Sequence, residues 1–321
     1  MPVLADATII GNGESARACA EVLTRAGFNI RHAFDLDPHD RSPVILGEVH
    51  GALGVARQAV EEGRHLLICN PQFLTGDKLS QMLEERRSAQ ALFLWSERCY
   101  HPGYRFVGGL IETDSTWRPK YLRLETLSAE PTTSTLARWR TLESLRLLMN
   151  VADDAPLSVA GSQAENSTRV GPDLITMLVG FKDIEAFVQV GMGEAIERRE
   201  MLLAAPNRRA FVDELNASAP VRLIDYDASS RPGARWLACG TPTPDEMARQ
   251  QCLAFFEATN RPSRAQDEAD AWRRSLATLS GLDRSLEANG AAVRITMRDE
   301  APRFRLISNA GLRLATPPAS A

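Results

Sequence analysis

The chain has 321 residues, a formal net charge of −4 and a hydrophobic fraction of 44%. This length accommodates two domains of ordinary size, and the apolar fraction is normal for a globular protein with a full core. Positive and negative charges are interleaved, which argues against nucleic acid or a membrane surface as partner. No window approaches the roughly 18 apolar residues of a membrane helix and the N-terminus lacks a basic n-region, so we expect a cytoplasmic protein.

Few side chains are available for acid–base or metal chemistry. The five cysteines have no metal-like spacing, so we expect reduced thiols and no bound metal. The chain has three lysines and five histidines, and no histidine lies beyond residue 101. Any lysine or histidine chemistry must come from Lys78, Lys120, Lys182, His32, His39, His50, His65 and His101.

The first predicted elements are a strand at 7–10, a glycine turn, a helix to about residue 25 and a strand at 29–34 that ends at Asp35. Glycines let the backbone approach a pyrophosphate at a helix N-terminus, and an acid after the second strand can bind a ribose 2′-hydroxyl. The pattern G-x-G-x-x-A predicts a dinucleotide site, although a purely structural turn is the alternative. Asp35 disfavours a 2′-phosphate, so NAD is preferred over NADP. The turn consists of Gly11, Asn12, Gly13, Glu14, Ser15 and Ala16.

The connection after the second predicted strand is too short to contain a helix. Only eight residues, 36–43, separate Asp35 from the next predicted strand at 44–46, and two of them are Pro38 and Pro43. A βαβ crossover needs at least about 10–12 residues. We therefore expect an extended connection without a helix and a thin wall on the adenosine side of the site.

The next segments continue to alternate between strand and helix. We predict a helix at 52–62, a strand at 65–68, a helix at 75–90, a strand at 91–95 and a short helix at 106–111. Such alternation is typical of an α/β domain with a parallel sheet. We place this Rossmann-like domain at residues 1–117.

From about residue 118 the pattern changes to alternating, half-exposed strands. We place a second, α+β domain at residues 118–295 and a peripheral tail at 296–321. Predicted strands lie at 121–127, 157–160, 174–180, 186–190 and 221–224, and predicted helices lie at 136–150, 244–259 and 267–289.

A segment that contains and closes one predicted strand, and a segment that follows the next strand, resemble motifs of the Gfo/Idh/MocA family of NAD(P)-dependent oxidoreductases. The segments "EGRHLLICNP" and "SERCYHPGYR" stand where the family has "AGKHVLxEKP" and "NxRxxPAYR". Residues 273–295 resemble the family's closing segment, whose helix packs back on the first domain. The resemblance covers about residues 7–295.

This resemblance implies a trimmed Rossmann domain followed by an α+β domain with an open, mostly antiparallel sheet. In the family that sheet often forms a dimer face, so we expect a homodimer through it. The resemblance also implies a small-molecule substrate or effector. Gly47, His50, Asn70 and Pro71 join the glycine turn and Asp35 as predicted cofactor-binding residues, although His50 could be a helix-start residue without chemistry.

Both family proton-transfer groups are missing. Asn70 replaces the EKP lysine and cannot exchange protons near neutral pH. The family's second-domain histidine aligns with about Arg140, and no histidine exists in this domain. Trp139 and Arg140 could bind an anionic or planar ligand, but a solvated helix face is the alternative.

The candidate substitutes are His101, Tyr104 and Lys120, each with a structural alternative. His101 could order the turn before Pro102, Tyr104 could pack and pair, and Lys120 could lie on the surface. We consider an oxidoreductase with altered acid–base residues, such as a reductase of a biosynthetic intermediate. The alternative is a non-catalytic regulator or partner subunit that binds a dinucleotide or metabolite. In either case we expect ordinary sugar or polyol dehydrogenation to be absent.

Overall fold

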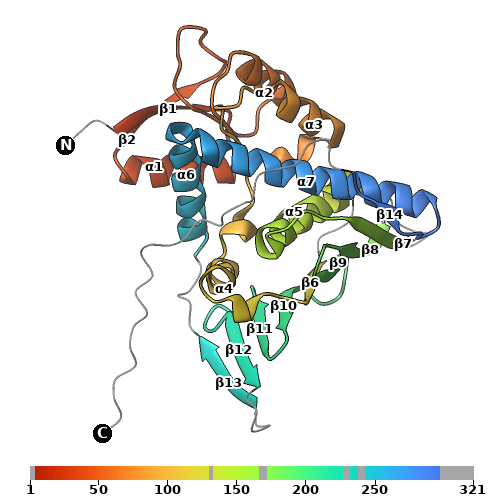
Figure 1. Ribbon diagram of the computed structural model, residues 1–321. Helices are drawn as coiled ribbons and strands as arrows, with labels where there is room; N and C mark the ends of the chain where they lie inside the picture. Colours follow the sequence, from red (N-terminus) through yellow and green to blue (C-terminus); the bar gives the residue numbers. More distant parts are fainter. Residues whose placement is uncertain are drawn as a thin grey trace, which may run out of the picture.

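The computed structural model describes residues 4–74, 76–129, 133–165, 172–226, 232–237 and 243–296. The first sheet is parallel and has the strand order β2-β1-β3-β4-β5. Figure 1 shows its strands β1 and β2 close to the N-terminus. The predicted trimmed Rossmann sheet is therefore confirmed. Its strands are β1 (Leu4–Ile10), β2 (Phe28–Ala33), β3 (Val44–Leu46), β4 (Leu66–Ile68) and β5 (Leu92–Leu94).

Helices cover both faces of this sheet because alternate strand residues point to opposite sides. Ile9, Ile45 and Leu67 pack with the helices α1 (Glu14–Arg25) and α6 (Pro244–Asn260). The opposite face packs with α2 (Ala52–Glu61) and α3 (Gly76–Glu85). The packing of α6 on α1 was not predicted, and it brings a late segment of the chain back to the first sheet.

The short connection after β2 contains no helix between residues 36 and 43, as predicted. The carboxylate of Asp40 fixes it by accepting hydrogen bonds from Thr8 at 2.7 Å and from the Ser42 hydroxyl at 2.9 Å. Burial opposes ionisation of Asp40, but these bonds and the charge of Arg31 lower its pKa to about 2. With the crossover missing, β2 is the edge strand, and Phe34 beyond it is 101% exposed.

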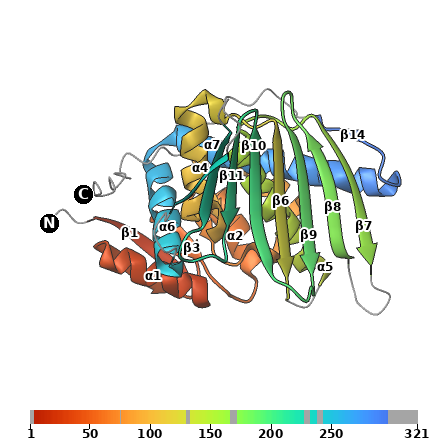
Figure 2. The same ribbon diagram turned by 90° about the horizontal axis from the view of Figure 1, so that it is seen from below.

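The second sheet has nine strands in the described parts of the chain, in the order β13-β12-β11-β10-β6-β9-β8-β7-β14 (Figure 2). All neighbours are antiparallel except β6 and β9, so the predicted mostly antiparallel sheet is confirmed. The strands are β6 (Tyr121–Ser128), β7 (Ser158–Glu165), β8 (Pro172–Gly180), β9 (Glu185–Met192), β10 (Arg198–Ala205), β11 (Arg208–Asp213), β12 (Val221–Tyr226), β13 (Pro232–Leu237) and β14 (Val293–Arg294).

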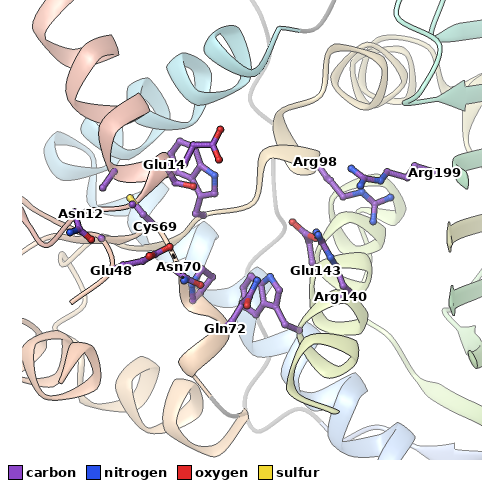
Figure 3. Close-up of a pocket in the computed structure, with 17 residues that line it drawn as sticks. Asn12, Glu14, Glu48, Cys69, Asn70, Gln72, Arg98, Arg140, Glu143 and Arg199 are labelled. Atoms are coloured by element: carbon purple, nitrogen blue, oxygen red, sulfur yellow. Dashed lines mark hydrogen bonds and ion pairs between the residues drawn. The ribbon is translucent and has the colours of Figure 1, made fainter. Parts of the chain in front are cut away.

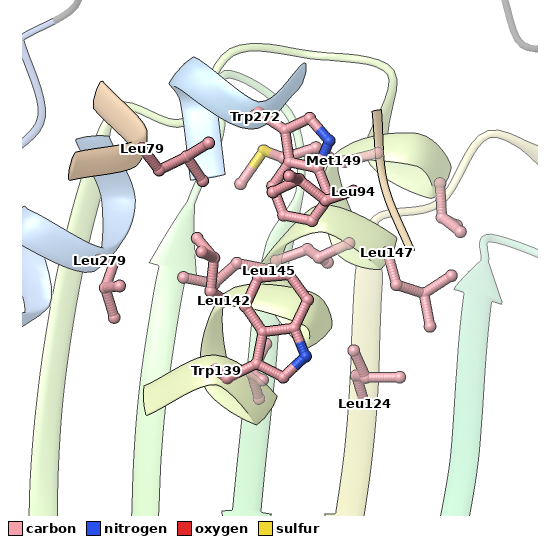
Figure 4. Packing of buried hydrophobic residues seen from close by; sticks show 14 of the residues in the cluster. Leu79, Leu94, Leu124, Trp139, Leu142, Leu145, Leu147, Met149, Trp272 and Leu279 are labelled. Carbon is pink, nitrogen blue, oxygen red and sulfur yellow. The ribbon is translucent and has the colours of Figure 1, made fainter. Parts of the chain in front are cut away.

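Two long helices, α5 (Ser134–Ala152) and α7 (Pro262–Glu287), cover one face of this sheet. The indole rings of Trp139 and Trp272 stack between them with centroids 5.8 Å apart (Figure 4). The apolar cluster around these rings continues into the first domain through Leu79 and Leu94. One face of the first sheet therefore shares an apolar cluster with the second sheet, while its other face has a separate cluster.

The remaining short elements are the 3-10 turns η1 (Pro71–Phe73), η2 (Glu97–Tyr100) and η3 (Ser115–Trp117) and the helix α4 (Pro102–Thr113). Of these, η1 connects β4 to α3, and the other three connect β5 of the first sheet to β6 of the second. The α7 segment that we expected to pack back does reach the first domain, where Arg273 donates to the Leu83 carbonyl at 2.7 Å. The boundary at residue 117 stays a prediction, and residues 297–321 of the predicted tail lie outside the described residues. None of the helices that the structure describes is long and apolar enough to cross a bilayer.

Candidate functional site

A cavity of about 340 Å³ lies between the carboxyl ends of the first-sheet strands and the second domain (Figure 3). Open α/β sheets bind ligands at this edge. The first-domain residues that line it include Asn12 to Ala16, Gly47, Glu48 and Cys69 to Gln72. The cavity is also lined by Trp95 and Arg98, which follow β5, and by Trp139, Arg140, Glu143 and Arg199 of the second domain.

The glycine turn has the backbone shape that its sequence predicted. Gly11 and Gly13 have φ angles of 86° and 103°, which L side chains rarely adopt. The N-cap of α1 is Gly13, which has no side chain and therefore leaves the N–H groups of the first helical turn without a side-chain cap. Those groups lack intrahelical partners and, with the helix dipole, favour an anion.

A carboxylate lies against this turn. The backbones of Asn12 and Glu48 exchange two hydrogen bonds, of 3.0 and 2.6 Å. The side chain of Glu48 then extends over Gly13, where a Cβ atom would be 3.1 Å from Oε1 of Glu48. Asn70 donates to the same oxygen over 3.4 Å. The first-domain wall of the cavity is therefore acidic where the turn offers N–H groups.

Two predicted cofactor residues lie away from the cavity. Asp35 is exposed at the end of β2 and accepts a hydrogen bond from the Leu36 N–H at 2.8 Å. His50 lines a separate, open hollow of about 460 Å³, together with Lys78. Glu48 and Asn70 line both spaces, so they stand between the hollow and the cavity.

The second-domain wall contains a buried carboxylate, Glu143, which is 4% exposed. Its Oε1 accepts a hydrogen bond from the Ser96 hydroxyl at 3.0 Å, and its Oε2 accepts one from Arg140 at 3.2 Å. Because both oxygens accept, the geometry suits the carboxylate form. Glu143 is thus a group able to exchange a proton that faces the cavity.

Two further arginines that line the cavity, Arg98 in η2 and Arg199 in β10, are also paired. Arg98 donates to Glu214 at 2.6 Å and to the Thr126 hydroxyl at 2.8 Å. Burial alone would lower the pKa of Arg98, but the Glu214 carboxylate raises it. Arg199 forms an ion pair with Glu197 at 2.7 Å. These pairs make the cavity lining polar while balancing most of its charge.

The structure does not bring the three proposed acid–base substitutes to the cavity. His101 is buried and caps α4, where its Nδ1 accepts the Gly103 N–H at 3.2 Å, and burial lowers its pKa. The buried hydroxyl of Tyr104 donates to Glu214, and burial raises its pKa. Lys120 is exposed at the start of β6. Their structural alternatives match these positions, and a catalytic role for them stays an untested prediction.

Several lining residues were not predicted. Glu143 lies one helical turn after Trp139 and Arg140, so a helical-face argument could have found it. Glu48 was passed over beside Gly47, and Arg199 lies on a strand that the sequence did not predict. The solvated face considered for Trp139 and Arg140 is wrong, because Trp139 is buried and Arg140 lines the cavity. No cluster of three metal-ligating side chains occurs among the residues that the structure describes.

Comparison with known proteins gives no match to a family model and none to a curated protein. Solved structures do match over nearly their whole length. A levoglucosan dehydrogenase in complex with NADH and levoglucosan has a TM-score of 0.71 at 14% identity, with 91% of this chain and 99% of that chain covered. A UDP-N-acetylglucosamine 3-dehydrogenase from Acidithiobacillus ferrooxidans has a TM-score of 0.69 at 19% identity, covering 88% and 98%.

A probable dehydrogenase from Thermotoga maritima is similar as well, with a TM-score of 0.68 at 13% identity, covering 90% and 99%. The chain therefore has the same fold as these three proteins, as the resemblance of its motifs implied. At these identities the likeness shows the fold alone.

Proposed function

We propose that the protein binds a nicotinamide dinucleotide at the glycine turn and acts as an oxidoreductase on a hydroxylated small molecule in the cavity. The observation that carries this proposal is the position of the turn. Its N-terminal N–H groups and its positive-φ glycines lie at the carboxyl edge of a parallel sheet and open onto a polar cavity. Two solved structures of this fold are complexes with NADH and with NAD.

The residues present fit a dinucleotide in most respects. Gly11, Gly13 and the start of α1 would hold the pyrophosphate, while Asn70 and Pro71 line the cavity beyond them. Asp35 would bind the ribose 2′-hydroxyl, which favours NAD over NADP. Glu48 is the exception, because its carboxylate lies against the turn. When bound, the nicotinamide supplies or accepts the hydride.

Glu143 is the residue that we assign to proton transfer. Oxidising an alcohol releases a proton as hydride leaves, and that proton needs an acceptor within hydrogen-bond reach. Asn70 offers none, but the Glu143 carboxylate faces the cavity and is oriented by Ser96 and Arg140. This assignment revises our expectation that polyol oxidation is absent, because the expectation did not include Glu143 among the candidate proton acceptors.

The test is a panel of sugars and polyols with NAD and NADP, followed through the absorbance of the reduced cofactor. We expect turnover of at least one hydroxylated substrate, faster with NAD than with NADP. Dinucleotide binding without turnover of any substrate, in either direction, would contradict the enzymatic proposal.

A specific observation favours a second candidate, a non-catalytic dinucleotide or metabolite binder. Asn70 cannot exchange a proton, and the Glu48 carboxylate narrows the site at the turn. Binding measured together with an empty turnover panel would support this candidate.

We also propose that the protein forms a homodimer through the second sheet. One row of neighbouring residues crosses the sheet face opposite to α5, and it consists of apolar side chains and one arginine. Leu178 in this row is 56% exposed. The row consists of Phe211, Leu202, Arg123, Phe187 and Leu178.

Light scattering after size-exclusion chromatography tests the dimer. We expect a dimeric wild type and a monomeric Phe187→Asp variant, because a charge on this row is costly to bury. Lys182→Glu, in the exposed turn beside the sheet, should stay dimeric. A monomeric wild type would refute the proposal.

A further inference from the structure

The backbone of Glu48 is fixed against the glycine turn. Its two hydrogen bonds with Asn12 form an isolated antiparallel bridge after β3. The approach is so close that a Cβ on Gly47 would lie 2.3 Å from the Asn12 carbonyl oxygen, and one on Gly11 would lie 2.6 Å from that of Glu48. Any rearrangement at this position therefore takes place by rotation of the Glu48 side chain.

That side chain occupies the space in front of the turn. A Cβ built on Gly13 would lie 3.0 Å from the carboxyl carbon of Glu48 and 3.1 Å from Oε1. In Figure 3, Glu48 lies between Asn12 and Asn70 on the first-domain side of the cavity. A carboxylate is favourable beside a helix N-terminus, and the same place suits a phosphate. Two anions cannot share it without strong repulsion.

The Glu48 carboxylate is weakly held, and an open hollow beside it has room for a rotated side chain. The hydrogen bond from Asn70 spans 3.4 Å, beyond the usual range for such bonds. Beside Glu48 lies the open hollow of about 460 Å³, which Lys78 and His50 also line. A rotated carboxylate would move toward the ammonium group of Lys78.

We propose that Glu48 occupies the phosphate position of the glycine turn and must rotate toward Lys78 before a dinucleotide binds. The inference rests on the proposed dinucleotide site and adds the residue that sets its affinity. Glu48 then lowers the affinity for ligands that contain a pyrophosphate and does not change the affinity for ligands without a phosphate.

Calorimetric titration with NADH tests this inference on the wild type, Glu48→Gln and Glu48→Ala. We expect both variants to bind NADH at least tenfold more tightly, which corresponds to about 1.4 kcal/mol. Glu21→Gln, which removes an exposed charge from the far part of α1, should stay within twofold of wild type. Adenosine, which has no phosphate, should bind the wild type and Glu48→Gln equally.

A double-mutant cycle tests the rotated position. Lys78→Gln should weaken NADH binding about threefold in the wild-type background and leave the affinity of Glu48→Ala unchanged. Thermal melting of each variant shows whether it is folded.

The outcomes separate this inference from the proposed function. If the wild type and both Glu48 variants bind NADH with equal affinity, Glu48 does not compete for the turn and only the inference is overturned. If Glu21→Gln gains as much affinity for NADH as Glu48→Gln does, the change in net charge explains the tighter binding and the inference is again overturned. If no variant binds NADH or NADPH, both proposals fail.

Discussion

Glu48 and Glu143 line opposite walls of one cavity, and the chain holds them very differently. Glu143 is buried, and each of its oxygens accepts a hydrogen bond from a different neighbour, at 3.0 and 3.2 Å. Glu48 receives one side-chain bond, at 3.4 Å, and it also lines an open hollow. Both residues are glutamates, so residue type does not explain the difference. Burial and the number of hydrogen-bond donors decide whether the carboxylate is held in one position or can be displaced by a ligand.

Replacing the fixed carboxylate has the largest expected effect. Glu143→Gln keeps the shape of the side chain but removes the proton acceptor, so we expect turnover to fall about 100-fold, at the low end for acid–base residues. NADH affinity should change by less than about twofold, because Glu143 lies on the wall opposite the turn. Steady-state kinetics and calorimetry on the same preparation check both values.

Retained turnover in Glu143→Gln would show that another group takes the proton. His101→Ala, Tyr104→Phe and Lys120→Ala would then become the next variants to assay, since those three residues were the candidates from sequence.

Asp40 is a third carboxylate, outside the cavity, and it is strongly stabilised in its ionised form by hydrogen bonds and a nearby positive charge. Its folded pKa of about 2 lies below the ordinary 3.8, so its ionised form stabilises the folded state at neutral pH. A shift of this size corresponds to roughly 2 kcal/mol, which is fully present above about pH 5 and is lost as the pH falls toward 2.

Urea unfolding of the wild type and Asp40→Asn between pH 7 and pH 2 checks this value. We expect the variant to be less stable by about 2 kcal/mol at pH 7 and the difference to shrink toward pH 2. A difference that does not depend on pH would contradict the role of the Asp40 charge.

A smaller effect is expected on folding stability when the hydrogen-bond donor to each cavity carboxylate is removed. Ser96→Ala removes a buried hydrogen bond to Glu143 and should destabilise the protein by about 1 kcal/mol. Asn70→Ala removes the long bond to Glu48 and should cost less than about 0.5 kcal/mol. Equal losses in the two variants would show that Glu48 is held as firmly as Glu143.

The sequence predicted the parts of the fold that local patterns determine. The glycine turn and the strand–helix alternation predicted the first domain, and the length of residues 36–43 excluded the crossover helix. The hairpin of β10 and β11 was missed because its arginine pairs interrupt the apolar alternation of "RREMLLAAPNRRAFVDE". The packing of α6 on α1 was missed because it depends on tertiary contacts between segments far apart in sequence.

The sequence named most of the first-domain side of the cavity, but on the second-domain side it named only Trp139 and Arg140 as residues that could bind a ligand. The turn and Asn70 lie in local motifs, so their positions followed from the resemblance. Glu143 and Arg199 converge on the cavity from α5 and β10, and no short motif contains both. His101 drew attention as a rare histidine, but its ring is used to cap α4.

The central claim is that the glycine turn binds the pyrophosphate of a dinucleotide. The most direct test is calorimetric titration of NADH into the Glu48→Gln variant with and without Gly13→Val. Gly13 has a φ of 103°, and a Cβ there would lie against residue 48 at the mouth of the turn. We predict that Gly13→Val abolishes NADH binding while thermal melting shows a folded protein. Unchanged affinity in a folded Gly13→Val protein would contradict the claim.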